Sequence, residues 1–166
     1  MEKIQKIYEV YNFDELDEEI QEQLIEEEKQ VQYEAYTETC LFEDMEEQAK
    51  ILLQKYFRNK AEYKSINYSL TWSQGDGAMI EFDLYYYNKY VKIRHNDNFY
   101  CHARTFSIDT WELTDKQEEQ LKNKIIQMNE EFEKIGWKLV SWDPEKELCI
   151  DYLKEHKYLK NGEVFE

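Results

Sequence analysis

The chain has 166 residues, of which 42% are apolar and 16% aromatic, and this is enough to bury one sizeable core. Its formal net charge of −16 argues against direct binding to nucleic acid or to an anionic membrane surface. No stretch approaches the ~18 consecutive apolar residues of a transmembrane helix, and the first residues lack the apolar segment of a signal peptide. The three cysteines are far apart and form no CxxC motif, which favours free thiols and a cytoplasmic location.

The negative charge is concentrated near the N-terminus. Residues 1–47 hold 17 Asp or Glu and 3 Lys or Arg, whereas residues 48–166 hold 20 and 18. A nearly neutral body therefore carries a strongly acidic segment, and such an asymmetry indicates a basic partner.

The acidic segment predicts a short strand at residues 3–11, followed by a helix. Either Asn12 or Asp17 can cap this helix with a side-chain oxygen. Acidic residues at its start suit the positive end of the helix dipole. Its narrow apolar stripe consists of Leu16, Ile20 and Leu24.

A second helix is expected at about residues 43–59, after an ambiguous connection from Gln30 to Phe42. Its apolar positions recur with helical spacing and form a buried stripe. They are Met45, Ala49, Leu52, Leu53 and Tyr56.

Residues 65–87 predict the central β-hairpin. Apolar and polar side chains alternate on both sides of a loop that holds two of the four glycines. A three-residue loop, Gly75 to Gly77, keeps every apolar side chain on one face, whereas a two-residue turn would place Leu70 opposite Asp83. The expected pairs are Trp72 with Ile80, Leu70 with Phe82, Tyr68 with Leu84 and Ile66 with Tyr86.

A third strand is expected at about residues 90–95. Its register sets Leu84 against Ile93 on the inner face. On the outer face, the same register sets Asp83 opposite Arg94 as a cross-strand ion pair.

A fourth strand is expected at about residues 99–108, after a turn at Asn96–Asn98. Alternation places one set of its side chains inside. The inward residues are Phe99, Cys101 and Ala103.

The last third of the chain predicts two helices. Residues 114–117 fit a capping box at the start of the first helix, which Gly136 ends. Residues 137–142 look extended, Asp143–Pro144 begins the last helix, and Asn161–Gly162 is a hairpin-type turn. The expected buried positions are Leu121, Ile125, Met128, Phe132 and Ile135 on the first helix, and Leu148, Tyr152 and Leu153 on the last.

Together these elements predict an α+β fold, with an antiparallel sheet of about four central strands and helices packed mainly on one face. We expect a single domain over residues 1–166. Its parts are an acidic helical portion at about 1–60, the sheet at about 64–108 and C-terminal helices at about 114–157.

Three segments carry a resemblance to a known group. They are Phe13–Leu16 followed by further acidic residues, Ser69–Leu70 leading into Ser73–Ala78, and the tail with Tyr152–Leu153 and Asn161–Phe165. Together they resemble a loose group of small phage and prophage proteins. The resemblance implies a mobile-element origin and points toward an anti-defence role of the anti-CRISPR type. It transfers no catalytic residues to this chain.

The loop Ser73–Ala78 leaves two interpretations open. Gln74 and Asp76 can form a binding or catalytic pair, for example of a hydrolase, because glycines let a ligand approach the backbone closely. Alternatively, Asp76 and the glycines only supply the backbone geometry of a tight hairpin loop.

No metal or cofactor site can be identified, and none is expected. A metal site needs three or four converging ligands with ordered spacing. The histidines show no such pattern and are interpreted as exposed strand and turn residues. They are His95, His102 and His156.

The predicted outer face of the sheet combines aromatic and cationic side chains. Single-stranded nucleic acids bind such surfaces by base stacking and by attraction of their backbone. A small single-stranded nucleic-acid-binding protein is therefore the alternative function, although the face also fits an ordinary solvent-facing sheet. The residues are Tyr85, Tyr87, Tyr90, Lys92, Arg94, Tyr100, His102 and Arg104.

The acidic helix supports the favoured hypothesis. Residues 14–28 hold nine carboxylates over about 22 Å of helix, which is one charge per roughly 2.5 Å against ~1.7 Å along duplex DNA. We expect a non-enzymatic, phage-encoded inhibitor that binds a basic nucleic-acid-binding surface of a host defence protein, a CRISPR nuclease or a restriction enzyme, and blocks nucleic-acid access. The other interpretation is a solvated face that keeps the protein in solution. The expected contact residues are Asp14, Glu15, Asp17, Glu18, Glu22, Glu26, Glu27 and Glu28.

Overall fold

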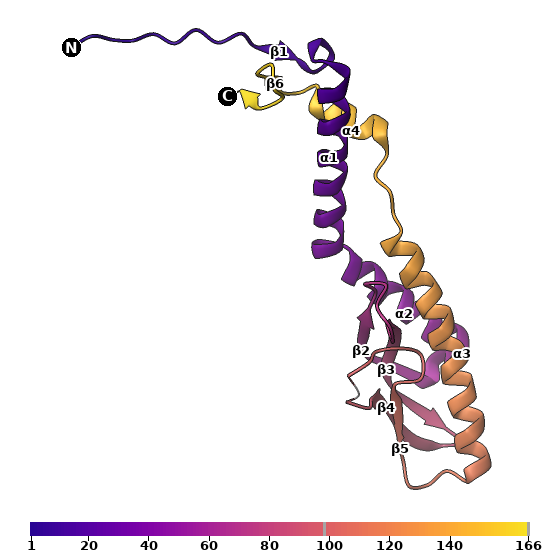
Figure 1. Cartoon of the computed structure of the whole chain (residues 1–166). Helices are drawn as coiled ribbons and strands as arrows, with labels where there is room; N and C mark the ends of the chain where they lie inside the picture. The colour runs from indigo at the N-terminus through magenta and orange to yellow at the C-terminus, as the bar shows by residue number, and fades with distance from the viewer. Residues whose placement is uncertain (98, 166) are drawn as a thin grey trace. The chain divides into compact units, whose positions relative to one another are not determined.

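A computed structural model describes residues 1–97 and 99–165. These residues form four α-helices and two antiparallel sheets, one of four strands and one of three (Figure 1), which confirms the α+β class. The residues group into two compact units: a terminal unit of Met1–Thr37 with Trp142–Glu166, and a central unit of Glu38–Ser141. From the sequence we expected one domain over residues 1–166.

The central unit holds the larger sheet and two long helices. Its strands lie in the order β2-β3-β4-β5, and each neighbouring pair is antiparallel. In chain order the elements are α2 (Leu41–Phe57), the short 3₁₀ helix η2 (Arg58–Lys60), β2 (Ala61–Ser69), β3 (Gly77–Tyr86), β4 (Lys89–His95), β5 (Phe106–Asp109) and α3 (Asp115–Val140).

The helices α2 and α3 pack against each other, α2 also against β2 and α3 against β3 (Figure 1). Alternate residues of β3 form the core, and Ile80, Phe82 and Leu84 are at most 1% exposed. The ring of Phe57, at the end of α2, has its centroid 5.3 Å from that of Phe82. The predicted helical stripes are confirmed at eight of their ten positions, whereas Tyr56 and Ile135 are half-buried. Their buried members are Met45, Ala49, Leu52, Leu53, Leu121, Ile125, Met128 and Phe132.

The β2–β3 hairpin has a longer loop than predicted. Because β2 ends at Ser69 and β3 begins at Gly77, seven residues connect the strands instead of three. The register differs from the prediction by an even number of residues, so the inward side chains of both strands keep their face. The observed pairs are Ile66 with Ile80 and Tyr68 with Ala78, in place of Ile66 with Tyr86 and Tyr68 with Leu84.

Leu70 and Trp72 lie in this loop, so the strand pairs predicted for them are wrong. The ring of Trp72 stacks on that of Trp137 in α3, with centroids 4.1 Å apart. Trp72 has a positive φ of 64°, which an extended strand does not allow. The two apolar side chains therefore pack against α3 rather than continue the sheet.

The helix α3 continues past Gly136 to Val140, so the predicted helix end and the extended segment at residues 137–142 are wrong. A Cβ atom at Gly136 would lie 2.9 Å from Leu70 Cδ1 and 3.1 Å from Met45 Cε. Glycine in the middle of α3 therefore allows Leu70 and Met45 to pack closely against the helix, and it does not cap the helix end.

The turn between β3 and β4 consists of Tyr87 and Asn88. Their φ values of 51° and 60° are both positive, as in the two-residue type I′ turns of tight hairpins. This turn moves the register by two residues from the prediction. The observed pairs are Leu84 with Val91, Phe82 with Ile93 and Asp83 with Lys92.

The fourth strand is shorter than predicted. Only Phe106–Asp109 pair with β4, and residues 99–105 form a loop instead. Phe99, predicted to point inward, is 95% exposed, whereas Ala103 is buried. Asn98, in the turn predicted before this strand, lies outside the described residues.

At its N-terminal end, β3 extends beyond β4, and side chains of α3 complete its hydrogen bonding there. The fully buried Asn129 accepts a hydrogen bond from the backbone N–H of Ile80 (3.2 Å) and donates one to the carbonyl of Ala103 (3.2 Å). One turn later, Glu133 accepts a hydrogen bond from the backbone N–H of Ala103 (2.6 Å). These two side chains join α3, β3 and the 99–105 loop, since buried backbone groups need partners.

The terminal unit combines most of one long helix with a short helix and a small sheet. Its sheet has the order β1-β6-β7. The elements are β1 (Tyr11–Asn12), the 3₁₀ helix η1 (Phe13–Glu15), α1 (Glu18–Thr39), α4 (Lys146–Leu153), β6 (Lys157–Tyr158) and β7 (Val164–Phe165).

This unit has its own small apolar core. Phe13, Leu16, Ile25, Leu153 and Tyr158 are buried together, and the predicted stripe residues Ile20 and Leu24 pack against them. The predicted turn before β7 is confirmed, with Gly162 at φ 88°.

Three predictions for the terminal unit are wrong. The strand expected at residues 3–11 begins only at Tyr11. On α4, Leu148 and Tyr152 are 57% and 47% exposed, and Cys149 is buried in their place. The helix starts at Lys146, after Glu145 at the N-cap position, rather than at Pro144.

We predict that Asn129→Ala lowers the free energy of unfolding by on the order of 2–4 kcal/mol. The N–H of Ile80 and the carbonyl of Ala103 would each lose a buried partner, at ~1–3 kcal/mol. Urea denaturation followed by circular dichroism measures the loss. Gln120→Ala, at an exposed position of the same helix, should change the stability by less than about 0.5 kcal/mol. Equal effects of the two variants would contradict a structural role for the Asn129 bridge.

Candidate functional site

The acidic surface predicted from the sequence lies on η1 and on the first half of α1. Seven of its eight carboxylates are exposed, and only Glu28 among them is half-buried. The apolar stripe on the opposite side of the helix packs into the core of the terminal unit, so the charged side chains remain in solvent. The residues of the acidic surface are Asp14, Glu15, Asp17, Glu18, Glu22, Glu26, Glu27 and Glu28.

Local partners neutralise this surface only in part. Asp14 Oδ1 lies 3.4 Å from Lys154 Nζ, and Glu26 Oε1 lies 4.0 Å from Lys29 Nζ. Glu15 accepts a backbone hydrogen bond of 2.7 Å at the start of η1. The terminal unit as a whole holds 19 Asp or Glu and 7 Lys or Arg, a net charge of −12, against 18 and 14, or −4, in the central unit.

The second predicted site is the loop between β2 and β3, and hydrogen bonds to Asp76 close it. Its carboxylate accepts bonds from the backbone N–H of Thr71 (2.8 Å) and of Ser73 (2.9 Å). The hydroxyls of Thr71 (2.7 Å) and Ser69 (2.8 Å) donate to it as well. These four bonds stabilise the seven-residue loop.

The ionisation of Asp76 limits its chemistry. The hydrogen bonds from the Thr71 hydroxyl and the Ser73 backbone lower its pKa to about 2. A carboxylate with this pKa does not exchange protons near neutral pH, so Asp76 is poorly matched to general acid or base catalysis. Gln74 is exposed beside it. Asp76 thus supports the loop, and a binding role for the Gln74–Asp76 pair stays a prediction.

The two glycines of this loop serve different purposes. Gly75 has φ 81°, a conformation that side chains with a Cβ rarely adopt. Gly77 lies against α3, where a Cβ would be 2.2 Å from Glu133 Oε1. Both glycines are accounted for by the backbone path and close packing.

The outer face of the sheet is not assembled as predicted for single-stranded nucleic acid. Asp83 is 4% exposed, and it accepts hydrogen bonds from Arg94 Nη2 (2.6 Å) and from the Tyr90 hydroxyl. Burial alone would raise the pKa of Asp83, but these two hydrogen bonds lower it. Arg94 and Tyr90, which were predicted to contact nucleic acid, are therefore held by the buried carboxylate of Asp83. Three others, Tyr100, His102 and Arg104, lie in the 99–105 loop and not on a strand.

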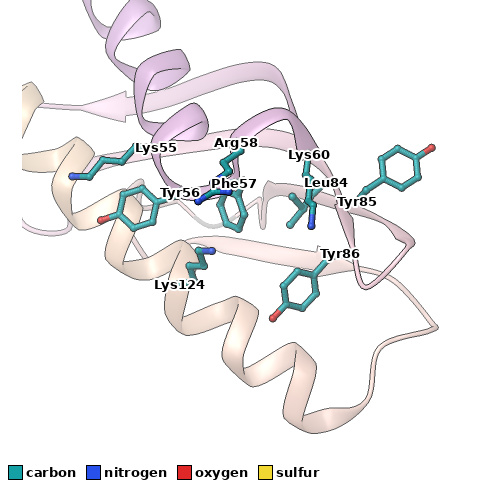
Figure 2. Close-up of a pocket in the computed structure, with 9 residues that line it drawn as sticks. All are labelled: Lys55, Tyr56, Phe57, Arg58, Lys60, Leu84, Tyr85, Tyr86 and Lys124. Carbon is teal, nitrogen blue, oxygen red and sulfur yellow. The ribbon is translucent and has the colours of Figure 1, made fainter.

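A different surface of the central unit gathers cations. A pocket of about 430 Å³ lies where α2 ends beside β3 and α3 (Figure 2). Its apolar lining includes Phe57 and Leu84, which are 6% and 1% exposed. We call it the cationic pocket, and its polar side chains come from α2, η2, β3 and α3. They include Lys55, Tyr56, Arg58, Lys60, Tyr86 and Lys124.

Most of these cations have no carboxylate partner. Lys55 Nζ pairs with Glu131 at 2.6 Å. Among the residues that the structure describes, no carboxylate lies within 4 Å of the side-chain nitrogens of Arg58, Lys60 or Lys124. Lys124 Nζ instead lies 4.8 Å from the centroid of the Phe57 ring. Three cations thus converge without neutralisation.

A second hollow, of about 340 Å³, adjoins the cationic pocket and shares Lys60, Tyr85 and Tyr86 with it. Its other lining residues are the two turn residues Tyr87 and Asn88. The rings of Tyr86 and Tyr87 meet edge to face, with centroids 4.7 Å apart. Aromatic faces therefore lie next to the cations.

The half-buried thiol of Cys101, in the central unit, is poorly suited to nucleophilic chemistry. Burial raises the pKa of Cys101 to about 11, so the thiol stays protonated at neutral pH. Burial likewise raises the pKa of Glu133. Within residues 1–97 and 99–165, no three His, Cys, Asp or Glu side chains are grouped so that they could hold a metal ion.

No family model, no curated protein and no solved structure matches this chain. Of the helices in the described ranges, none combines the length and the apolar character needed to cross a membrane. The resemblance to phage proteins therefore stays a prediction.

Sequence reasoning missed the cationic pocket. Lys55, Arg58 and Lys60 fall within six residues, and a cluster of cations in an acidic chain is a signal that identifies them. Lys124 is far away along the chain, and only the packing of α3 beside α2 brings it to the same pocket.

We predict that Asp76→Asn destabilises the protein at neutral pH and has a smaller effect in acid. The pKa of Asp76 is about 2 in the folded protein against an ordinary value of 3.8. The stabilisation is therefore present above about pH 4 and is lost as the pH falls toward 2. Thermal unfolding midpoints of the wild-type protein and the variant, measured over this range and at pH 7, should converge at low pH.

The control for this prediction is Asp109→Asn, which changes an exposed carboxylate on β5. It should leave the unfolding midpoint nearly unchanged at every pH. A gap between wild type and Asp76→Asn that is the same at pH 7 and at about pH 2 would show that the charge of Asp76 does not stabilise the loop.

Proposed function

We propose that this protein is a non-enzymatic binding protein whose acidic surface occupies a basic, nucleic-acid-binding surface of a partner protein and excludes the nucleic acid. One observation carries the proposal. Seven exposed carboxylates of the acidic surface lie on η1, on α1 and at Asp17 between them, in a unit with a net charge of −12.

The helix presents part of this charge as a regular row. Glu18, Glu22 and Glu26 follow one another at i, i+4 spacing, so they project from the same side of α1 about 6 Å apart. All three are exposed. A groove of Lys and Arg that normally holds phosphates can meet such a row with one cation for each carboxylate.

Packing in the terminal unit supports this presentation. Leu16 and Ile25 are 6% and 5% exposed, and a Cβ on Gly162 would lie 2.8 Å from Ile20 Cγ2. The side of α1 opposite the carboxylates is thus fixed by the apolar core of the terminal unit. A helix held in this way loses little further conformational entropy on binding, which favours affinity.

The electrostatics favour fast association more than great affinity. A single exposed ion pair is worth at most ~1 kcal/mol, but a field of uniform sign steers encounter with an oppositely charged groove. This contribution decreases with salt, because the Debye length is about 10 Å at 0.1 M. We further propose that the partner is a host defence protein, a CRISPR nuclease or a restriction enzyme, as the resemblance to phage proteins implies.

We predict that the charge reversal Glu18→Lys/Glu22→Lys/Glu26→Lys weakens partner binding by at least about tenfold at low salt. The partner is first identified by affinity capture from host cells, with the wild-type protein as bait. The purified partner is then titrated with labelled nucleic acid, and displacement by each protein is followed by fluorescence anisotropy over a salt series. The wild-type protein should displace the nucleic acid less well as salt increases.

The matched control, Glu47→Lys/Glu118→Lys/Glu119→Lys, makes the same charge change at exposed positions of the central unit. Circular dichroism establishes that both variants remain folded. Three results would overturn the proposal: full displacement by the α1 variant, an equal loss in the control variant, or displacement that salt does not affect.

A further inference from the structure

We infer that the cationic pocket and the hollow beside it bind a nucleotide, with its phosphate among the cations and its base against the tyrosines. This site lies in the central unit and involves none of the residues of the acidic surface. The inference is therefore independent of the proposed function, and either one can fail without the other.

The phosphate part of the inference rests on uncompensated positive charge. In a chain with a net charge of −16, Arg58, Lys60 and Lys124 line one pocket, and no described carboxylate lies within 4 Å of them. Lys124 Nζ lies over the face of the Phe57 ring, and this contact is weaker than a charge-assisted hydrogen bond to a phosphate. All three side chains are exposed and hydrated in the free protein, and a dianionic phosphate can accept charge-assisted hydrogen bonds from them.

The local structure explains part of this arrangement, but not all of it. Cations at the end of α2 interact favourably with the negative end of the helix dipole, and this accounts for Lys55. Lys124 belongs to α3 and gains nothing from that dipole. Arg58 has φ 54° and ψ −136°, a conformation that costs a non-glycine residue free energy. Arg58 nevertheless brings a guanidinium group to the pocket from this position.

The aromatic part of the inference rests on the arrangement of the tyrosines. In Figure 2 the Tyr86 side chain points to the same side as Lys60 and Lys124, whereas Tyr85 points away from them. Tyr87, 57% exposed, and the amide of Asn88 line the adjoining hollow. Bases stack on such rings at ~1–3 kcal/mol each, and an exposed amide can bond the edge of a base.

The residues that line the two hollows indicate which chemical class of ligand fits them. They share Lys60, Tyr85 and Tyr86, so a ligand that fills both has an anionic group next to a flat aromatic group. Volumes of about 430 and 340 Å³ lie in the range of small-molecule sites. A nucleotide has this chemistry, either free or at the end of a strand. The net charge of −16 repels a polyanion, so we expect a free mononucleotide to bind better than an oligonucleotide at low salt.

The experiment titrates ¹⁵N-labelled full-length protein with 5′-AMP, adenosine, inorganic phosphate and a 5′-phosphorylated eight-residue oligodeoxyadenylate. 5′-AMP should shift backbone resonances of residues 55–60, 84–88 and 124 in a saturable way. Adenosine, which lacks the phosphate, should bind at least about tenfold more weakly, because the charge-assisted bonds are lost. The ranking of 5′-AMP and the oligonucleotide distinguishes a free nucleotide from a strand end, and either ranking supports a nucleotide site.

The variant Lys60→Gln/Lys124→Gln removes two of the unpaired charges and leaves uncharged polar side chains in their place. It should weaken 5′-AMP binding by at least about tenfold and leave adenosine binding unchanged. Lys116→Gln/Lys122→Gln is the matched control, because it makes the same charge change on α3 outside the cationic pocket. The inference is overturned if neither 5′-AMP nor the oligonucleotide binds saturably, if adenosine binds as well as 5′-AMP, or if the two double variants lose equal affinity.

Discussion

The arrangement of the central unit depends on the way α3 completes the edge of β3. Asn129 bonds the backbone of Ile80 and of Ala103, and Glu133 bonds the same loop one turn later. A buried amide with both of its groups satisfied fixes the helix in one rotation and one position along the strand. That position also lets the ring of Trp137, near one end of α3, stack on the ring of Trp72. At the other end it brings Lys124 into the cationic pocket.

Charge in this protein is separated by structure as well as by sequence. The terminal unit has a net charge of −12 and shows most of its carboxylates to solvent, whereas the central unit gathers three unpaired cations in one pocket. Neither arrangement is required for stability, since surface charges contribute little to folding and like charges repel. The two surfaces suit different ligands, a basic protein groove for the first and a small phosphate-bearing molecule for the second.

The polar side chains that were assigned a role from the sequence differ in the structure from those that line the cationic pocket. Asp76 and Asp83 are occupied by hydrogen bonds within their own loop and strand pair, and their pKa values are lowered as a result. Arg58, Lys60 and Lys124 were not assigned to any site from the sequence, although Arg58 and Lys60 belong to a local cluster of cations. Whether a polar residue has a partner depends on its neighbours in space, and this decides which residues remain available for binding.

The sequence by itself determined the α+β class, the apolar stripes of α2 and α3, the capping box at Thr114 and the face of each strand in the central hairpin. These features follow from local periodicity and local hydrogen bonding, which neighbouring residues specify. Only the tertiary structure decided the register of β2 on β3, the continuation of α3 through Gly136 and the loop at residues 99–105. Each of these depends on contacts between distant segments, namely Trp72 with Trp137, Gly136 with Leu70, and Asn129 with Ala103. The cationic pocket is of the same kind, because Lys124 meets Arg58 and Lys60 only after two helices pack on one sheet, and no local pattern encodes that meeting.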